Sequence, residues 1–218
     1  MKIIARIMTD MKEKFGIPRQ SGIVPTLTGR IVFEPAYRDP DALRGLEGFS
    51  HIWVIWRFDG FENESWSPTV RPPRLGGNRR MGVFATRSPN RPNPIGLSLL
   101  RLEGTEGTDL IVSGVDMRDG TCIYDIKPYL RLSDCVPDAK DGFAGDTGGK
   151  KCSVVYECDV SRLSDADLET VTALLEEDPH PSYKTGPDRI YGMRYKDKNI
   201  RFRVDGDKIT VIEIAVTE

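Results

Sequence analysis

The sequence predicts a mainly β protein with two parts, an N-terminal antiparallel β-barrel-like domain and a small α+β C-terminal domain. Two observations support this prediction. Up to Tyr129, short runs rich in aromatic and β-branched residues alternate with Gly- or Pro-containing turns, which is typical of a closed or nearly closed antiparallel sheet. Beyond residue 151, a helical pattern precedes closing β runs. We therefore expect a β-barrel domain over 1–132, a flexible linker over 133–151 and an α+β domain over 152–218.

The barrel domain is expected to contain several short strands. The most apolar run, Phe49–Phe58, holds two tryptophans and predicts a buried strand. Before it, Pro40–Gly48 predicts a short helix that Asp39 or Asp41 caps and whose two leucines face inward. The predicted strands are, in chain order, Ile3–Ile7, Gly29–Pro35, Phe49–Phe58, Met81–Thr86, Leu97–Leu102 and Leu110–Asp116.

The C-terminal domain is expected to begin with an amphipathic helix. Ser164 and Asp167 have the spacing of a capping box, with Asp in place of the usual Glu. Apolar residues then recur at helical spacing up to Leu175, and Asp178–Pro179 ends the helix. The preceding 133–151 segment is rich in Gly and Asp, as linkers are. The β runs that close the chain are Ile190–Tyr195, Ile200–Val204 and Ile209–Val216.

Composition narrows the class of protein. The chain has 218 residues, 39% of them hydrophobic, and no apolar run approaches the roughly 20 residues of a membrane-spanning helix. The first residues lack the apolar stretch of a signal peptide, so we expect a cytoplasmic protein with no membrane partner. The four cysteines form no Cys-x-x-Cys pair and lie far in sequence from both histidines. We therefore expect reduced thiols and predict no metal site.

Charge is distributed unevenly along the chain. The net charge is −2, but the stretch from Ser67 to Leu102 contains no Asp or Glu. A basic run is usually a solvated face, but the lack of interleaved acids favours a site for an anionic partner such as RNA. Prolines stiffen the run, and Trp66 just before it offers a stacking surface. Its arginines are Arg71, Arg74, Arg79, Arg80, Arg87, Arg91 and Arg101.

Motif patterns exclude some enzyme classes and single out three polar segments. The chain has no Gly-x-Gly-x-x-Gly after its first strand, no Gly-Lys-Ser/Thr loop and no Gly-x-Ser-x-Gly elbow. This argues against dinucleotide, P-loop and serine-hydrolase sites. On composition alone, Glu13–Gly22 is an ordinary connection between strands. Its Gly and Pro residues fix the backbone, and its side chains include planar hydrogen-bonding groups. The other two segments are the arginine-rich Arg71–Pro94 and the mixed-charge Asp116–Tyr129.

Two details of these patterns have competing interpretations. Asp125 and Lys127 alternate on an extended segment, so their side chains point the same way. They form either part of a functional site, with Tyr129 stacking or hydrogen bonding beside them, or a surface ion pair of little energetic value. His51 stands in an apolar strand, which favours a hydrogen-bonded core histidine over a catalyst.

The three segments together resemble one family. It is the bacterial S-adenosylmethionine-dependent methyltransferase family that acts on N6 of threonylcarbamoyladenosine at position 37 of certain tRNAs. The resemblance covers about Ile4 to Tyr129, and a weaker match at Asp178–Tyr183 has His180 where the family commonly has Arg. The matching motifs are Lys14–Gln20, Val70–Gly77, Gly82–Gly96, Asp119–Thr121 and Asp125–Tyr129.

This resemblance implies a β-barrel methyltransferase that works as a homodimer, with S-adenosylmethionine near the subunit interface. The partner is the anticodon stem-loop of tRNA, where position 37 lies in a single-stranded loop. The arginines expected to grip its phosphates are Arg71, Arg74, Arg79, Arg80 and Arg91. The implied cofactor-binding residues are Gln20, Ser21, Gly22, Ile23, Asp59, Gly60, Arg87, Leu97, Asp125, Ile126, Lys127 and Pro128; among them, Asp59 stands where family members vary.

The reaction implied is direct transfer of the sulfonium methyl group to N6, for which the protein mainly aligns the reacting atoms. Asp125 is the expected catalytic residue that accepts the N6 proton, and Lys127 and Tyr129 position the substrate. A carboxylate also suits the cofactor's ribose hydroxyls and cationic centre, so cofactor binding is the alternative role of Asp125. Two other functions stay open. One is a non-catalytic RNA-binding protein that uses the same arginines, and the other is an enzyme for a phosphorylated metabolite.

Overall fold

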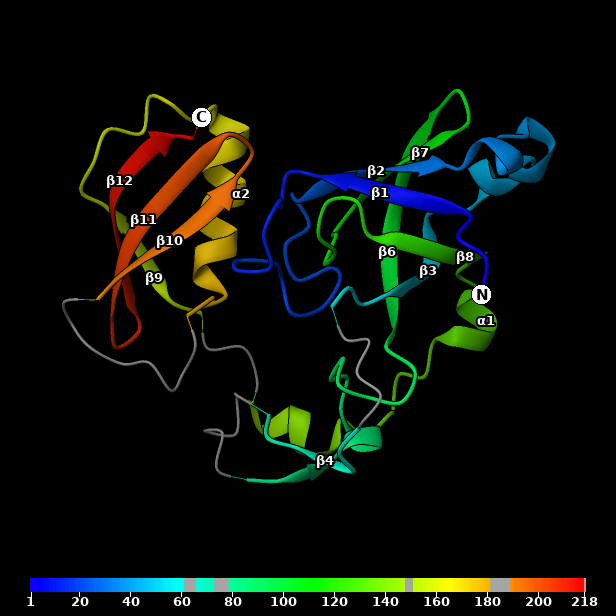
Figure 1. The fold of residues 1–218 in the computed structure, drawn as a ribbon, viewed down its shortest axis with the longest axis horizontal. Helices are drawn as coiled ribbons and strands as arrows, with labels where there is room; N and C mark the ends of the chain where they lie inside the picture. Colours follow the sequence, from blue (N-terminus) through cyan, green and yellow to red (C-terminus); the bar gives the residue numbers. More distant parts are fainter. Residues whose placement is uncertain (61–65, 73–78, 148–150, 181–188, 218) are drawn as a thin grey trace.

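The structure is a computed structural model that describes residues 1–60, 66–72, 79–147, 151–180 and 189–217. It has two domains that lie side by side, a barrel and a smaller sheet-and-helix domain (Figure 1). The predicted mainly β fold, with an α+β C-terminal domain, is confirmed.

Within the described residues, six antiparallel strands close into a barrel (Figure 1). In barrel order the strands are β1 (Ala5–Thr9), β2 (Thr28–Phe33), β7 (Asp109–Ser113), β6 (Ile95–Glu106), β3 (His51–Arg57) and β8 (Cys122–Pro128). Alternate side chains of each strand enter the interior, as Ile52, Val54 and Trp56 do in β3. Neighbouring strands run in opposite directions. One mouth of the barrel therefore collects the segments that follow β1, β3 and β7 and those that precede β6 and β8.

Two predicted elements of this domain are different in the structure. Of the strand predicted at Met81–Thr86, only β5 (Met81–Gly82) is extended, and it pairs with β4 (Thr69–Val70). The next residues form the 3-10 turn η5 (Val83–Ala85), because the Thr86 hydroxyl donates to the Val83 carbonyl at 2.8 Å and closes the turn.

The predicted helix at Pro40–Gly48 is instead two 3-10 turns, η2 (Pro40–Leu43) and η3 (Leu46–Gly48). Gly45 separates them at a φ of 89°, in the left-handed region that favours glycine. The predicted cap is present, since the Asp39 carboxylate accepts the Asp41 N–H at 2.9 Å. Both leucines are partly buried against the core, as expected. A further 3-10 turn, η1 (Pro35–Tyr37), precedes them.

The C-terminal domain is a four-stranded sheet with one helix, counted over its described residues. Ser164 caps the helix as predicted, because its hydroxyl accepts the Asp167 N–H at 3.2 Å. The sequence did not predict β9, which pairs in parallel with β12. The elements are β9 (Ser153–Tyr156), α2 (Asp165–Glu176), β10 (Ile190–Tyr195), β11 (Lys198–Asp205) and β12 (Lys208–Val216).

The segment predicted as a flexible linker includes regular turns. The short helix α1 (Arg131–Asp134) overlaps its start, and the 3-10 turn η6 (Gly142–Thr147) lies within it. The indole N–H of Trp53 on β3 donates to the Asp134 carboxylate at 2.9 Å, so α1 is held against the outside of the barrel.

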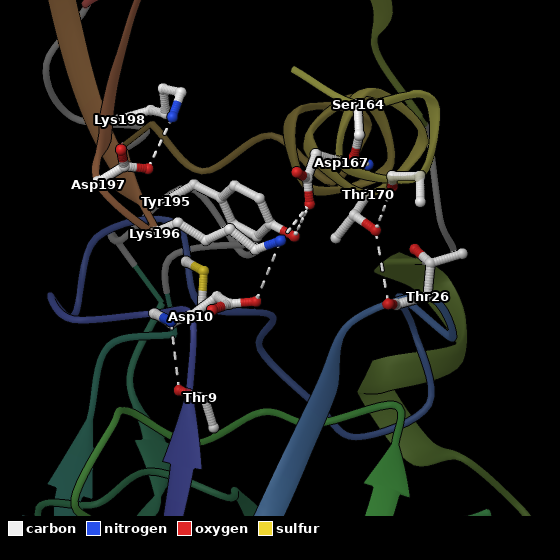
Figure 2. Close-up of polar contacts among 12 residues, drawn as sticks. Thr9, Asp10, Thr26, Ser164, Asp167, Thr170, Tyr195, Lys196, Asp197 and Lys198 are labelled. Carbon is white, nitrogen blue, oxygen red and sulfur yellow. Dashed lines mark hydrogen bonds and ion pairs between the residues drawn. The ribbon is translucent and has the colours of Figure 1, made fainter. Parts of the chain in front are cut away.

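A polar cluster joins the two domains (Figure 2). The Lys196 ammonium donates to the Asp167 carboxylate at 2.6 Å and lies 3.9 Å from that of Asp10, which follows β1. The Tyr195 hydroxyl also donates to Asp167, at 3.1 Å. The hydrogen bond to Asp167 raises the pKa of Lys196, and burial raises the pKa of Asp10. One hydrophobic cluster runs beneath these contacts through both domains, so the C-terminal domain is packed onto the barrel.

The contact between Gly96 on β6 and Trp56 on β3 predicts a stability effect. A Cβ atom at Gly96 would lie 2.2 Å from the Trp56 indole. We expect Gly96→Ala to lower the free energy of unfolding by roughly 1–3 kcal/mol, because the indole must leave its packed position. Urea unfolding measures this. Gly82→Ala is the matched control, since nothing lies within 4 Å of the added atom there. Equal midpoints for the two variants would contradict the prediction.

Candidate active site

A pocket of about 610 Å³ opens at the mouth of the barrel described above. Its size is in the usual range for a small-molecule site. Four segments far apart in sequence form its walls: the loop after β1, the end of β3, the loop before β6 and the segment after β7. Its charged lining residues are Lys14, Arg19, Asp59, Arg87, Arg91, Asp116 and Arg118. Its apolar lining includes Ile17, Trp56, Phe58 and Leu97.

Hydrogen bonds tie these walls together. The Arg87 guanidinium donates to the side-chain carbonyl of Gln20, which joins the loop before β6 to the loop after β1. Lys14 donates to the backbone carbonyl of Asp59 at 3.0 Å, and Arg118 pairs with the Asp59 carboxylate at 3.2 Å. The structure therefore brings Gln20, Asp59 and Arg87, three of the predicted cofactor residues, into one pocket. Gly60 follows Asp59 at a φ of 77°.

Asp116 is a pocket residue that the predicted cofactor and catalytic sets omit, although it opens the mixed-charge segment Asp116–Tyr129. The Ser98 hydroxyl donates to its carboxylate at 2.6 Å and itself accepts the Trp56 indole N–H at 2.8 Å. The Ser21 N–H also binds this carboxylate. Burial raises the pKa of Asp116 to about 6, although these hydrogen bonds and the charge of Arg87 oppose the rise. The available signal was its position, since it is the acid that ends the strand predicted at Leu110–Asp116.

Ser21, Gly22 and Ile23 anchor the loop rather than line the pocket. The Ser21 hydroxyl accepts the Leu99 N–H at 3.0 Å, and the Gly22 N–H donates to the Gly114 carbonyl at 2.8 Å. Ile23 packs against the core. Their assignment to cofactor binding stays a prediction, and their contacts place Gln20 at the pocket.

The predicted residues Asp125–Pro128 lie on β8, one strand away from the pocket. Ile55 on β3 pairs with Leu97 on one side and with Asp125 on the other. Adjacent strands are spaced about 4.8 Å apart, so Leu97 and Asp125, on the two strands that flank β3, are separated by about 10 Å along the barrel wall. The predicted cofactor set is thus split between the pocket, which includes half-exposed Leu97, and this strip on β8.

Two of the three predicted catalytic side chains contact each other, and the third, Tyr129, lies among aromatic rings. Asp125 and Lys127 form an ion pair at 3.0 Å, as their alternation predicted, and Asp125 also accepts the Ile126 N–H at 3.0 Å. The Tyr129 ring lies 6.0 Å from Trp53 and 6.3 Å from His51, measured between centroids. His51 was expected in the core. It is instead partly buried on the outer face of β3, with its Nδ1 2.9 Å from the Ser50 hydroxyl.

The arginines of the acid-free run have different surroundings. Arg71, Arg79 and Arg80 are exposed, and Arg74 lies outside the described residues. Arg91 donates to the backbone carbonyls of Val83 and Thr86, at 3.1 and 2.8 Å, so it braces η5 at the edge of the pocket. Arg101 pairs with Glu103 on β6 at 3.3 Å. The run is therefore not one uniform patch.

Three further findings concern the part of the chain that the structure describes. No group of three or more His, Cys, Asp or Glu side chains there could hold a metal ion. The four cysteines are free thiols. No helix among these residues has the length and apolar character needed to cross a membrane.

Comparison with known proteins identifies the family of the chain. Residues 6–135 match the sequence model of the tRNA-methyltransferase O N-terminal domain, and 156–217 match that of the TrmO C-terminal domain. The chain is 40% identical to the tRNA (adenine(37)-N6)-methyltransferase of Escherichia coli, over 92% of this chain and 91% of the relative. A relative of the same name from Eikenella corrodens is 45% identical over 72% of this chain and 92% of its own.

Solved structures extend the comparison to the whole fold. A crystal structure of TrmO from Pseudomonas aeruginosa superimposes with a TM-score of 0.78 at 33% identity, covering 98% of this chain and 97% of that one. The agreement includes both domains. The chain therefore belongs to the tRNA-methyltransferase O family of S-adenosylmethionine-dependent methyltransferases.

Proposed function

We propose that this protein transfers a methyl group from S-adenosylmethionine to N6 of threonylcarbamoyladenosine at position 37 of tRNA. One structural observation carries the proposal. The pocket at the barrel mouth gathers four of the residues implied for cofactor binding, from three segments far apart in sequence: Gln20, Asp59, Arg87 and Leu97. Relatives named tRNA (adenine(37)-N6)-methyltransferases support the reaction.

The lining of the pocket fits the cofactor's chemistry. The cofactor combines an amino-acid head, a sulfonium, ribose hydroxyls and an aromatic base. Arg87 suits its carboxylate, whereas Asp59 and Asp116 suit its cationic or hydroxyl groups. Phe58 and Leu97 offer an apolar wall for the base. When bound, the cofactor supplies an electrophilic methyl group, and the residues of the chain hold and orient it.

The strip on β8 is the proposed place of the substrate base. The Asp125 carboxylate pairs with Lys127 and accepts the Ile126 N–H, so two contacts orient it in the unliganded protein. We assign Asp125 to accepting the N6 proton, and Lys127 and Tyr129 to positioning the nucleotide. The exposed arginines Arg71, Arg79 and Arg80, with Arg74, would contact phosphates of the anticodon stem-loop.

We also propose a cytoplasmic homodimer. Three exposed leucines could be covered by a second subunit. Leu97 lies on β6, in the face formed by β6, β3 and β8, and Leu130 and Leu132 lie at the start of α1 and within it. A dimer built on this face would place the β8 strip of each subunit near the interface. Sedimentation velocity of the purified chain tests it, and a monomer at micromolar concentration would count against it.

The decisive measurement is methyl incorporation from labelled S-adenosylmethionine into tRNA that carries or lacks the threonylcarbamoyl group. We expect incorporation only into the modified tRNA, because its N6 is the proposed acceptor. A non-catalytic RNA-binding protein would bind the tRNA but take up no cofactor in isothermal titration. An enzyme for a phosphorylated metabolite would take up cofactor and methylate neither tRNA.

A further inference from the structure

Two exposed aromatic side chains meet on the arm formed by β4 and β5. Trp66 precedes β4, and Phe84 lies in η5 directly after β5. The pairing of Thr69 with Gly82 brings the two together, with ring centroids 5.9 Å apart and ring planes inclined by 35°. Trp66 is 46% exposed and Phe84 is 76% exposed. Aromatic rings exposed on an arm do not gain the free energy of burial within the folded chain, so their exposure indicates contact with a partner.

The arm holds these rings in place. The Val83 N–H donates to the Pro68 carbonyl at 2.9 Å, and the Ser67 hydroxyl donates to the Thr69 carbonyl at 2.8 Å. Arg91 binds two carbonyls of the η5 turn from the pocket side. The backbone on both sides of Phe84 is therefore pinned, and little conformational entropy remains to be lost when a partner docks.

The charge around the rings selects the kind of partner. Arg79 and Arg80 are exposed on the same arm, and no Asp or Glu occurs between residues 67 and 102. A partner must therefore offer negative charge together with flat apolar faces. Single-stranded RNA offers both, because its phosphates pair with arginines while its unpaired bases stack on aromatic rings. A protein partner would need clustered acids beside apolar groups to meet the same requirement.

The arm is connected to the pocket. Arg87 and Pro89, which line the pocket, follow Phe84 by three and five residues. Even a fully extended chain separates the Cα atoms of Phe84 and Arg87 by at most about 10 Å. A base stacked on the arm would therefore lie within a few nucleotides of a base presented beside the pocket.

We propose that Trp66 and Phe84 form a stacking platform for an unpaired base of the RNA loop that contains the methylated adenosine. Arg79 and Arg80 hold the phosphates on either side of that base. This assignment rests on the proposed function, because it takes the RNA loop from it. The proposed stacking contact does not depend on the identity of the base, since every base has a face that can stack.

The test compares the double variant Trp66→Ala/Phe84→Ala with the full-length unchanged chain in binding to a modified anticodon stem-loop. We expect the dissociation constant to rise roughly 5- to 100-fold, as for the loss of one stacked base. The slope of affinity against salt should stay unchanged, because no phosphate contact is lost. Arg79→Ala/Arg80→Ala should instead weaken binding and lower that slope by roughly 1.4. Phe84→Tyr, which keeps a ring, should bind normally.

Val155→Ala controls for the loss of exposed apolar surface, because this side chain is 39% exposed on β9. Cofactor titration should give the same affinity for every variant, which separates this proposal from the cofactor site.

An unchanged RNA affinity in the double variant would overturn the platform. Dissociation of a dimer in sedimentation would overturn it too, since the rings would then belong to a protein interface. If the unchanged chain bound no RNA, the proposed function would fail together with the platform. Should the double variant misfold, Phe84→Ala alone serves, because this side chain is mostly in solvent.

Discussion

Replacing Asp116 by Asn is expected to weaken cofactor binding and, at the same time, to stabilise the unliganded protein. The carboxylate lies in the pocket wall, held by Ser98 and the Ser21 N–H. Asn keeps one acceptor oxygen for these donors, but its amide nitrogen donates instead of accepting, and the side chain carries no charge for a cationic or hydroxyl group of the cofactor. Loss of such a buried partner costs about 2–4 kcal/mol, or roughly 30- to 1000-fold in affinity.

The gain in stability follows from the direction of the pKa shift. The pKa of Asp116 is about 6 in the folded protein, against an ordinary value of 3.8 that applies to the unfolded chain. Between these pH values the folded state binds more protons, so stability falls as pH rises through this window. Above about pH 7 the ionised carboxylate costs up to about 3 kcal/mol, which Asn removes. A residue with only a structural role would show the opposite sign.

The pH dependence of cofactor binding separates this carboxylate from its neighbours. Affinity for S-adenosylmethionine should fall as pH drops through about 6 in the unchanged chain and should be flat in Asp116→Asn. Ser98→Ala should move the midpoint upward, because the Ser98 hydroxyl lowers the pKa of Asp116. The other charged groups lining the pocket are Lys14, Arg19, Asp59, Arg87, Arg91 and Arg118.

Isothermal titration between pH 5 and pH 8, together with urea unfolding of each unliganded variant, measures both effects. If Asp116→Asn bound cofactor as tightly as the unchanged chain, the pocket carboxylate would have no part in binding. If affinity fell while the urea midpoint also fell, the effect would be a loss of structure instead.

Asp116 illustrates what a sequence does not reveal. The Leu110–Asp116 run predicted a strand ending at this acid, whereas β7 ends at Ser113 and Asp116 follows it. The acid's environment comes from Ser98 on β6, Trp56 on β3 and the loop after β1. These residues are remote in sequence and meet only when the barrel closes. By contrast, the Asp125–Lys127 ion pair was predictable, because it depends on alternation along a single strand.

The same distinction explains the differences in fold. The barrel follows from short apolar runs and their turns, which are local features. β9 lacks a strong alternating pattern and depends on its parallel partner β12, which lies more than fifty residues later. Likewise, the acid-free run predicted a site for an anionic partner but not the individual contacts of its arginines, of which Arg91 braces η5 and Arg101 pairs with Glu103.

Gly16→Ala is expected to damage both the domain interface and the pocket. Gly16 has a φ of 93°, and an added Cβ would lie 2.4 Å from the Met193 sulfur, which is fully buried in the C-terminal domain. The left-handed backbone costs about 1–2 kcal/mol for a residue with a Cβ. The overlap with Met193 adds roughly 1–3 kcal/mol, since a buried side chain has little space to move into.

Gly45→Ala is the matched control for the backbone contribution. Its φ is 89°, and nothing lies within 4 Å of the added atom. Urea unfolding should therefore show a small loss of stability for Gly45→Ala and a larger one for Gly16→Ala. Adding Met193→Ala to Gly16→Ala should recover cofactor affinity more than stability, because the overlap disappears but a cavity is left.

The effect on cofactor binding follows from what Gly16 joins. Phe15 next to it stacks on Tyr191 and Phe202 of the C-terminal domain, at 6.3 Å from each. The residues that follow, up to Gln20, form one wall of the pocket. A displacement of about 1 Å in such a wall can cost up to about 100-fold in catalysis. We expect cofactor affinity to fall in Gly16→Ala and to stay unchanged in Gly45→Ala. Equal affinity in both variants would show that the C-terminal domain supports the fold without shaping the pocket.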